Sequence, residues 1–178
     1  MTEQIKIDFD KIVQTSNFTK ADIELKRQYL NKFIENGFPN RKLENWKFSD
    51  LSQIIHNNIG QLSYFNDYSS SNKINASTFV DGLEHNKIFF INGRVEKIDF
   101  SYEDEGQIEI IEDPKSDNIL DNNNSLIDLN KAFTNKSYRI LIKKNYFFKK
   151  PLIVYHTTNH KIKSKNINLS LEFKLEQN

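Results

Sequence analysis

The histidines are the chain's most versatile candidates for chemistry, and two of the four lie four positions apart. On a helix, the spacing of His156 and His160 would put two metal ligands on one face. The residues between them are Thr157, Thr158 and Asn159, which indicate a strand end followed by a turn. No acid-rich stretch nearby supplies a third ligand. We therefore expect the four histidines, His56, His85, His156 and His160, to lie on the surface, and we predict no metal-binding residue.

Nucleophilic and phosphate-binding motifs indicate no other reactive site. The sequence has no Gly-x-Ser-x-Gly elbow, and without cysteine it cannot form a Cys–His dyad. Its five glycines form no phosphate-binding loop and no dinucleotide-binding turn. The acidic residues Glu103, Asp104, Glu105 and Glu109 lie in a polar stretch, which favours a solvated acidic loop. We predict no catalytic residue, no cofactor-binding residue and no enzymatic activity.

The composition narrows the class of protein further. The 178 residues carry a formal net charge of +1, which gives no basic surface for nucleic acid or an anionic membrane. Aromatic residues make up 12%, enough to predict a hydrophobic core. The absence of cysteine excludes disulfides and thiolate-bound metals within this chain. The sequence shows no signal-peptide pattern and no apolar run of about 20 residues, so we expect a cytoplasmic protein.

One segment, residues 41–51, combines the chain's single tryptophan with charged residues beside a predicted helix start. A structural interpretation is that Trp46, Phe48 and Leu51 anchor this loop on a helical core. Arg41 would then pair with Glu44 or lie over the Trp46 ring. A functional interpretation is a docking surface, because Trp and Arg are enriched at interaction hot spots. The candidate structural or docking residues are Arg41, Glu44, Trp46, Lys47 and Leu51.

The elements around this segment are predicted to be helical. Thr19 followed by Asp22 resembles a helix-capping pair, and apolar residues then recur with a period of about 3.6 residues. Gly37 and Pro39 end that helix. A second helix is predicted to start at Ser49 and to end at residues 57–60. A weaker pattern allows a short helix at residues 5–15.

The rest of the chain predicts a loop, strands and one further helix. Residues 66–78 are polar and lack periodicity, which predicts a linker. Short strands are expected at residues 87–91, 94–98, 107–111, 138–142 and 152–155, and Asn92-Gly93 favours a tight hairpin turn between the first two. The polar run 121–124 is expected to cap a helix with an apolar face of Leu126, Leu129, Ala132 and Phe133.

The clearest strand pattern is at residues 167–175. Ile167, Leu169, Leu171, Phe173 and Leu175 alternate with polar residues, so one face should be buried and the other solvated.

Three stretches, taken in order, resemble SufD, a family of iron–sulfur cluster assembly proteins. The candidate residues of segment 41–51 are similar to the tryptophan-containing signature near the start of that family. Residues 89–94 resemble its Asn-Gly hairpin. Residues 129–133, 140–143 and 151–156 resemble the passage into its core. The related SufB lacks the tryptophan signature in this form, so SufD is the better match.

The resemblance implies an α+β fold. An N-terminal helical domain (residues 1–62) is followed by a small mixed α/β region (residues 63–136), and residues 137–178 would be the first strands of a right-handed parallel β-helix. The function implied is a non-catalytic scaffold subunit of the Suf iron–sulfur cluster assembly complex. Its partners would be SufB-like and SufC-like subunits, reached through the full-length protein. The cluster would be handled by the whole complex.

Members of the family are much longer than this chain, so the resemblance implies a truncated β-helix. A solenoid coil buries its faces only against neighbouring coils. We therefore expect strand 167–175 to present an open edge and to promote self-association. The alternative is a free-standing β-rich binding module, for instance for carbohydrate, with Tyr64, Phe65 and Tyr68 stacking on the ligand.

Overall fold

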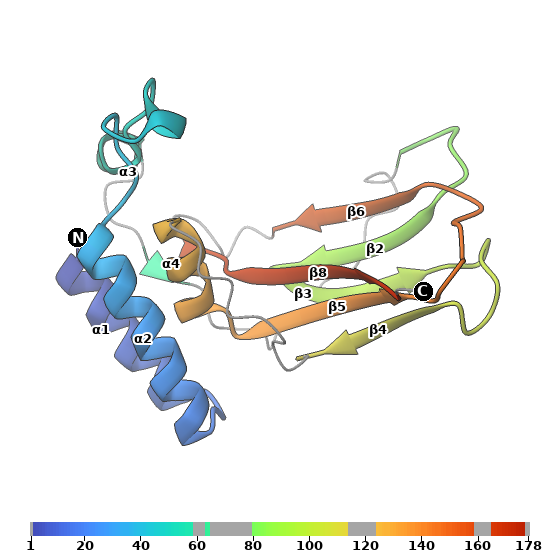
Figure 1. The fold of residues 1–178 in the computed structure, drawn as a ribbon, viewed down its shortest axis with the longest axis horizontal. Coiled ribbons are helices and arrows are strands. Elements are labelled where there is room, and N and C mark those ends of the chain that lie inside the picture. The colour runs from blue at the N-terminus through green and yellow to red at the C-terminus, as the bar shows by residue number, and fades with distance from the viewer. Residues whose placement is uncertain (1, 59–62, 65–79, 114–123, 159–164, 177–178) are drawn as a thin grey trace. The chain divides into compact units, whose positions relative to one another are not determined.

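A computed structural model gives the fold of residues 2–58, 63–64, 80–113, 124–158 and 165–176 (Figure 1). Helices and strands are both present, which confirms the predicted α+β class. The chain divides into two compact units. The helical unit comprises residues 1–66, 116–135 and 163–170, and the strand unit comprises residues 67–115, 136–162 and 171–178. Each unit therefore draws on segments that are far apart in the sequence.

The helical unit begins with two helices, α1 (Thr2–Thr15) and α2 (Lys20–Asn36). The predicted cap of α2 is confirmed, because the Thr19 hydroxyl accepts from the Asp22 amide and the Asp22 carboxylate accepts from the Thr19 amide. The Thr19 hydroxyl also donates to the Asp22 carboxylate at 2.7 Å, and this hydrogen bond, followed by the one from the Thr19 amide, lowers the pKa of Asp22. Gly37 ends α2 with a positive φ of 69°, a conformation that favours glycine. The weaker pattern at residues 5–15 is also a helix, and α1 extends it to Thr2.

The core of the helical unit joins α1 and α2 to α4 (Ser125–Phe133). The predicted cap of α4 is confirmed at Asn124, whose side chain accepts from the Leu126 amide. The Phe133 ring meets the Phe9 ring edge-on, with centroids 5.9 Å apart. The Lys26 ammonium donates to main-chain carbonyls at the end of α4. The buried apolar residues of this core are Ile5, Phe9, Ile12, Tyr29, Leu30, Phe33, Tyr64, Leu129, Ala132 and Phe133.

Four shorter elements complete the described part of the helical unit. The 3-10 helix η1 (Glu44–Trp46) and the helix α3 (Leu51–Asn58) follow α2, and α3 confirms the second predicted helix. The part of the predicted helix end at residues 59–60 and the predicted linker at residues 66–78 lie outside the described residues. The short strands β1 (Ser63–Tyr64) and β7 (Lys165–Asn166) pair in parallel.

The strand unit contains a sheet with the order β3-β2-β6. Its strands are β2 (Asn86–Ile91), β3 (Arg94–Asp99) and β6 (Leu152–Thr157). The predicted hairpin is confirmed: β2 and β3 are antiparallel, and Asn92 and Gly93 between them have φ of 54° and 81°. Two successive positive φ values define the type I′ turn that Asn-Gly favours. β2 pairs with β6 in parallel on its other side.

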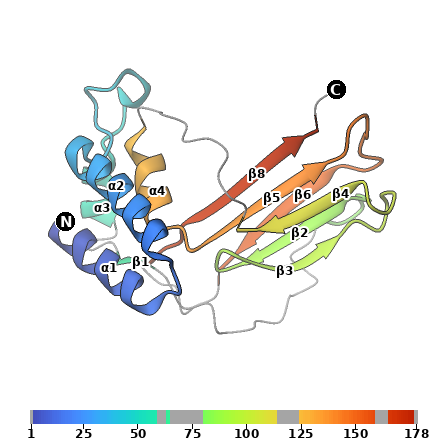
Figure 2. The ribbon, with the colours of Figure 1, turned by 60° about the horizontal axis from the view of Figure 1, so that its bottom comes forward.

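A second sheet has the order β4-β5-β8. Its strands are β4 (Ile108–Glu112), β5 (Lys136–Ile142) and β8 (Leu169–Leu175). β4 and β5 are antiparallel. β8 runs in the same direction as β5 (Figure 2), and the Glu176 amide donates to the Ile142 carbonyl across this pair at 3.0 Å. The strands predicted at residues 107–111, 138–142 and 152–155 are thus all present, each within a residue or two of its expected bounds.

The two sheets share a buried layer of aromatic and branched residues. Phe90 on β2 is 0% exposed, and its ring meets the Tyr138 ring of β5 with centroids 5.4 Å apart. The Tyr138 hydroxyl also accepts from the Val95 amide of β3 at 3.3 Å. On the opposite face of β2, Phe89 and Ile91 pack with Tyr155 of β6. Sheet β3-β2-β6 is therefore buried on both faces along β2, which explains its continuous apolar run.

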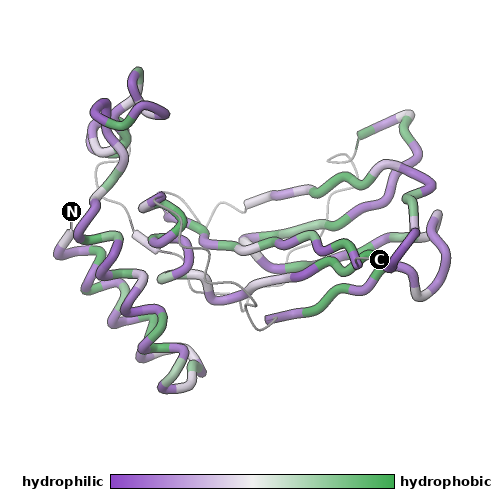
Figure 3. The backbone as a smooth tube through the Cα atoms, in the orientation of Figure 1, coloured by the Kyte–Doolittle hydropathy of each residue, from purple (hydrophilic) through white to green (hydrophobic). Residues whose placement is uncertain are grey.

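The alternation predicted for residues 167–175 is present in β8 (Figure 3), but the prediction that its apolar face is buried is wrong. Phe173 is 49% exposed and Leu175 is 67% exposed, while Leu169 and Leu171 are half-buried. Exposure of this face therefore increases from Leu169 toward Leu175. The two-residue period correctly predicted which side chains share a face of the strand. Burial of that face also requires another element packed against it, which the period does not predict.

Candidate functional site

The candidate residues fall on the segment from residue 41 to residue 51, which the backbone closes into a loop after α2. The Leu51 amide donates to the Pro39 carbonyl at 3.2 Å and joins the two ends of the loop. Asn40 starts the turn, because its side chain accepts from the Lys42 amide at 2.9 Å. The Asp50 carboxylate accepts from the Gln53 amide at 3.1 Å and so begins α3. Local hydrogen bonds therefore position the whole segment.

The side chains of this loop are largely exposed, which contradicts part of the anchoring interpretation. Trp46 and Leu51 are half-buried, whereas Phe48 is 90% exposed and does not anchor the loop. The Lys47 ammonium lies 5.8 Å from the centroid of the Phe48 ring. Two further apolar side chains of this region, Leu43 and Ile54, are 50% and 44% exposed.

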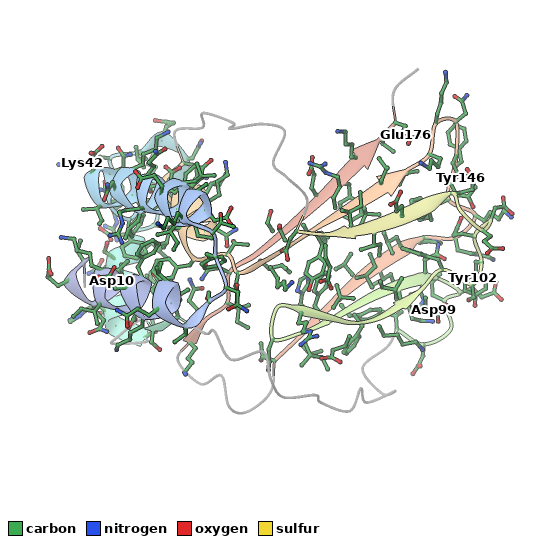
Figure 4. All side chains as sticks on the ribbon, turned by 90° about the horizontal axis from the view of Figure 1, so that it is seen from below. Asp10, Lys42, Asp99, Tyr102, Tyr146 and Glu176 are labelled. Atoms are coloured by element: carbon green, nitrogen blue, oxygen red, sulfur yellow. The ribbon has the colours of Figure 1, made fainter. Side chains whose placement is uncertain are left out.

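The charged candidates also face solvent. Arg41, Glu44 and Lys47 are exposed, and Lys42 extends to the outside of the helical unit (Figure 4). Within the described residues, Arg41 neither pairs with Glu44 nor lies over the Trp46 ring, so both contacts expected by the structural interpretation are missing. Exposed aromatic and apolar side chains next to cations form a surface suited to binding another protein. The loop holds no group poised for covalent chemistry.

The histidines have three different environments. His156, on β6, is exposed on one side and stacks on the Phe90 ring with centroids 4.8 Å apart. Partial burial lowers the pKa of His156 below its ordinary value of 6.5. His56 is exposed on α3, and His160 lies outside the described residues. Across the ranges that the structure describes, no group of three or more histidine or acidic side chains could hold a metal ion.

His85 contradicts the expectation of surface histidines, because it is buried at 2% exposure. Its Nδ1 lies 2.6 Å from the Leu83 carbonyl, which can only accept, so Nδ1 donates. Its Nε2 accepts from the Tyr155 hydroxyl at 2.6 Å, and that hydroxyl oxygen accepts from the Val80 amide at 3.1 Å. This chain of hydrogen bonds fixes the ring and ties the segment before β2 to β6.

The acidic residues at 103–109 are not simply a solvated loop, and that interpretation is wrong for Glu103. The half-buried Glu103 carboxylate accepts from the Tyr146 hydroxyl at 2.6 Å and from the Asn86 side-chain amide at 2.5 Å. It also accepts from the main-chain amides of Lys149 and Lys150. The loops that carry Tyr102 and Tyr146 lie at the same end of the strand unit (Figure 4).

These contacts decide the ionisation of Glu103. Burial by itself would raise its pKa, but the hydrogen bonds from Tyr146, Lys149, Asn86 and Lys150 together hold the pKa below the ordinary value of 4.5. The neighbouring Asp104 forms an ion pair with the Lys149 ammonium at 2.5 Å. Glu105 and Glu109 are exposed, as expected. Glu103 therefore joins the two loops and has a structural role.

Sequence reasoning could not have found the Glu103 and His85 contacts, because their partners are distant in the chain. Tyr146 is 43 residues from Glu103, and Tyr155 is 70 residues from His85. The one available signal was the polar pair His85-Asn86 directly before a buried strand. The exposed loop at residues 41–51 therefore remains the candidate site, and its chemistry is that of a binding surface.

In comparisons with known proteins, no protein-family model and no curated protein matches the chain. None of the described helices is long and apolar enough to cross a membrane.

Proposed function

We propose that the chain is the N-terminal region of a SufD-like scaffold subunit of a cytoplasmic iron–sulfur cluster assembly complex. In this proposal the chain is non-catalytic and acts with SufB-like and SufC-like subunits. Its own side chains take part in no reaction step. The observation that carries the proposal is the order of three SufD-like stretches along the sequence. Single motifs of this kind are moderately specific, but their order makes chance similarity a poor explanation.

The placement of these stretches supports the proposal. The first forms the exposed loop before α3, the second forms the β2–β3 hairpin, and the third runs from α4 through β5 to β6. The first two stretches thus each coincide with one structural feature, and the third covers parts of one helix and two strands. A signature that sits on an exposed loop is well placed to contact a partner.

The path of the strands supports the proposed β-helix core. The chain leaves β5 in one sheet, passes through β6 in the other sheet and returns in β8 beside β5, running in the same direction (Figure 2). β6 likewise lies parallel to β2. A return to the same sheet with the same direction is the repeating step of a solenoid. We propose that residues 137–178 form the first strands of a right-handed parallel β-helix.

Affinity purification from the source cell tests the proposal. A tag is added to the chromosomal gene that encodes the chain, so that the protein is recovered at its native length. We expect SufB-like and SufC-like subunits to co-purify in stoichiometric amounts. Recovery of intact tagged protein without either subunit would contradict the proposed function.

A matched pair of variants tests the role of the loop. Phe48 is 90% exposed on the candidate loop, and Phe147 is 85% exposed in the strand unit. Neither substitution to serine should alter folding, because neither ring is buried. We expect Phe48→Ser to reduce the recovered partner at least fivefold and Phe147→Ser to leave it unchanged. Equal recovery for both would show that the loop is no docking surface.

The carbohydrate-binding alternative is weakened by one of its three residues. Tyr64 is 6% exposed and stacks on the Phe133 ring with centroids 3.6 Å apart, so its face is already occupied. Phe65 and Tyr68 lie outside the described residues. A heat-shift screen against sugars addresses this alternative, because a ligand that binds the folded state raises the melting temperature. We expect no shift from any sugar; a concentration-dependent rise would favour the alternative.

A further inference from the structure

We propose that the loop at residues 41–51 docks on an acidic protein surface, in which an apolar pocket takes the Phe48 ring and carboxylates form the rim. This inference rests on the proposed function, because it names the chemistry of the partner's side of the same contact. Three features of the loop carry it: cations without internal partners, exposed apolar side chains next to them, and a backbone that holds both in place.

The first observation is a group of cations that the chain itself does not neutralise. Arg41, Lys42 and Lys47 are exposed, and none of the three forms an ion pair with any residue that the structure describes. Glu44 is the only acidic residue among residues 41–47, and these seven residues therefore carry a net charge of +2, three cations less one carboxylate. This charge is available to a partner.

Several other charged residues are already committed to partners within the chain. Asp50, at the end of the loop, accepts from a main-chain amide of α3 at 3.1 Å. In the strand unit, Lys143 pairs with Glu176 at 3.0 Å. Lys149 of that unit pairs with Asp104 at 2.5 Å. An ion pair within the chain leaves little charge for a partner, whereas the cations of the loop can attract carboxylates on another molecule.

The second observation is the apolar surface next to these cations. Phe48 is 90% exposed and Leu43 is 50% exposed. The Lys47 ammonium lies 5.8 Å from the centroid of the Phe48 ring, so the loop presents a charge and an aromatic ring close together. Burial of an exposed phenyl ring is favourable, and a carboxylate at the rim of the pocket would pair with the ammonium as the ring enters. The complementary surface is therefore an apolar pocket with an acidic rim.

The third observation is that main-chain hydrogen bonds order the loop. The Trp46 amide donates to the Leu43 carbonyl at 2.8 Å, and the Ser49 amide donates to the Trp46 carbonyl at 2.8 Å. The bond from the Leu51 amide to the Pro39 carbonyl closes the loop. A surface that is ordered before binding loses less conformational entropy on association. The loop therefore presents its ring and its charges in a conformation ready for docking.

These observations favour a protein over a nucleic acid as the acidic partner. Binding of nucleic acid depends on several phosphate contacts along a basic surface, whereas residues 41–47 carry only +2 and include the Glu44 carboxylate. That carboxylate would repel phosphates. Leu43 and Ile54, at 50% and 44% exposure, are aliphatic and suit an apolar protein pocket better than stacked bases.

Co-purification with the tagged protein at its native length tests the charge of the partner surface. The measured quantity is the amount of SufB-like and SufC-like subunits recovered per tagged chain. We expect Lys47→Glu to lower this amount about fivefold, because an attraction becomes a repulsion. We expect Glu44→Gln to maintain or raise it, because the change removes a carboxylate that faces an acidic surface. Recovery should also fall when the salt of the wash rises from about 0.05 M to about 0.5 M.

Lys20→Glu is the matched control in the same unit. Lys20 is exposed and begins α2, at the opposite end of that helix from the loop. An acidic residue in the first turn of a helix is compatible with folding. We expect this variant to recover the wild-type amount of both subunits, and circular dichroism of each purified variant verifies that it is folded.

The outcomes separate this inference from the proposed function. Equal recovery with Lys47→Glu and Lys20→Glu, or a loss with Glu44→Gln, would overturn the acidic partner surface and leave the scaffold role in place. Loss of the partner after nuclease treatment would show that a nucleic acid occupies the loop, which would also overturn the inference. Wild-type protein that recovers neither subunit would overturn the inference and the proposed function together.

Discussion

The helix-capping contacts of the helical unit are local, although its Lys26 ammonium donates to carbonyls 105 and 108 residues away. The polar contacts that hold the strand unit together join distant parts of the chain. Thr19 and Asp22 cap α2 from three residues apart. In the strand unit, Asn86 donates to Glu103 across 17 residues, and Tyr155 contacts His85 across 70 residues. The helix ends of the helical unit are therefore fixed by contacts that a short window of sequence contains, while its core also requires the distant helix α4. The strand unit depends on polar groups whose partners are distant in the sequence and are brought close by its sheets.

The two units also differ in what they leave exposed. The helical unit exposes a loop, residues 41–51, whose conformation is closed by its own backbone hydrogen bonds. In the strand unit, an exposed apolar face belongs to a regular strand, β8, at Phe173 and Leu175. The exposed apolar residues of the loop thus lie on irregular backbone, whereas those of β8 lie on a regular strand.

The largest expected effect comes from Phe90→Ala in the strand unit. Phe90 is 0% exposed and contacts Tyr138 and His156. Removing a fully buried phenyl ring costs about 3–5 kcal/mol, from lost burial and the cavity left behind. We expect amide hydrogen exchange to show reduced protection in β2, β5 and β6. The comparison of the two units would fail if protection fell first in α1 and α2.

A smaller effect is expected for Glu103→Gln, which removes the charged acceptor shared by two loops. Hydrogen bonds to a charged group contribute about 1.5–3 kcal/mol, so we expect a loss of about 2–3 kcal/mol in urea unfolding. Glu105→Gln is the matched control on the same loop, since Glu105 is exposed. If the two variants unfold at the same urea concentration, the Glu103 contacts do not stabilise the two loops.

The acid stability of the strand unit should depend on the same carboxylate. Because the folded state lowers the pKa of Glu103 below 4.5, its contribution is complete above that pH. The contribution is lost as pH falls through the lower, folded pKa. We expect acidification below about pH 4.5 to destabilise the wild type more steeply than Glu103→Gln. Parallel losses in the two proteins would show that other groups govern acid unfolding.

The smallest effect is expected in the helical unit, from Thr19→Ala. This change removes one half of the capping box of α2 and should cost about 1 kcal/mol. The matched control is Thr15→Ala near the end of α1, where the hydroxyl bonds back to the Lys11 carbonyl and caps no helix start. Circular dichroism during thermal unfolding gives the measurement. A larger loss for Thr15→Ala would contradict the local account of this unit.

The comparison explains which features could be predicted from sequence. The start of α2 at Thr19, its end at Gly37 and the Asn92-Gly93 turn each depend on adjacent residues, and each was predicted correctly. The burial of His85 and the role of Glu103 depend on residues brought together by the sheets. The exposure of Phe173 likewise depends on which strand lies beside β8. Local chemistry therefore predicts the elements, and tertiary pairing decides which polar groups are buried.

The candidate loop could be predicted from sequence because its signals also lie in adjacent residues. The mixture of Trp46 with charged residues is visible in sequence, as is the SufD-like order of the three stretches. The exposure of Phe48 could not be predicted, because an aromatic residue between a lysine and a serine fits a core anchor equally well. The structure assigns it to the surface at 90% exposure.

Disruption of the gene that encodes this chain, in its source organism, tests the central claim most directly. The measurement is the activity of an iron–sulfur-dependent dehydratase in cell extract, with a cluster-free enzyme of the same cells as control. The account predicts that the dehydratase loses activity and regains it when iron and sulfide rebuild its cluster in vitro, while the control enzyme is unaffected. Full dehydratase activity in the disrupted strain, under growth conditions where the gene is normally expressed, would contradict a role in iron–sulfur cluster assembly.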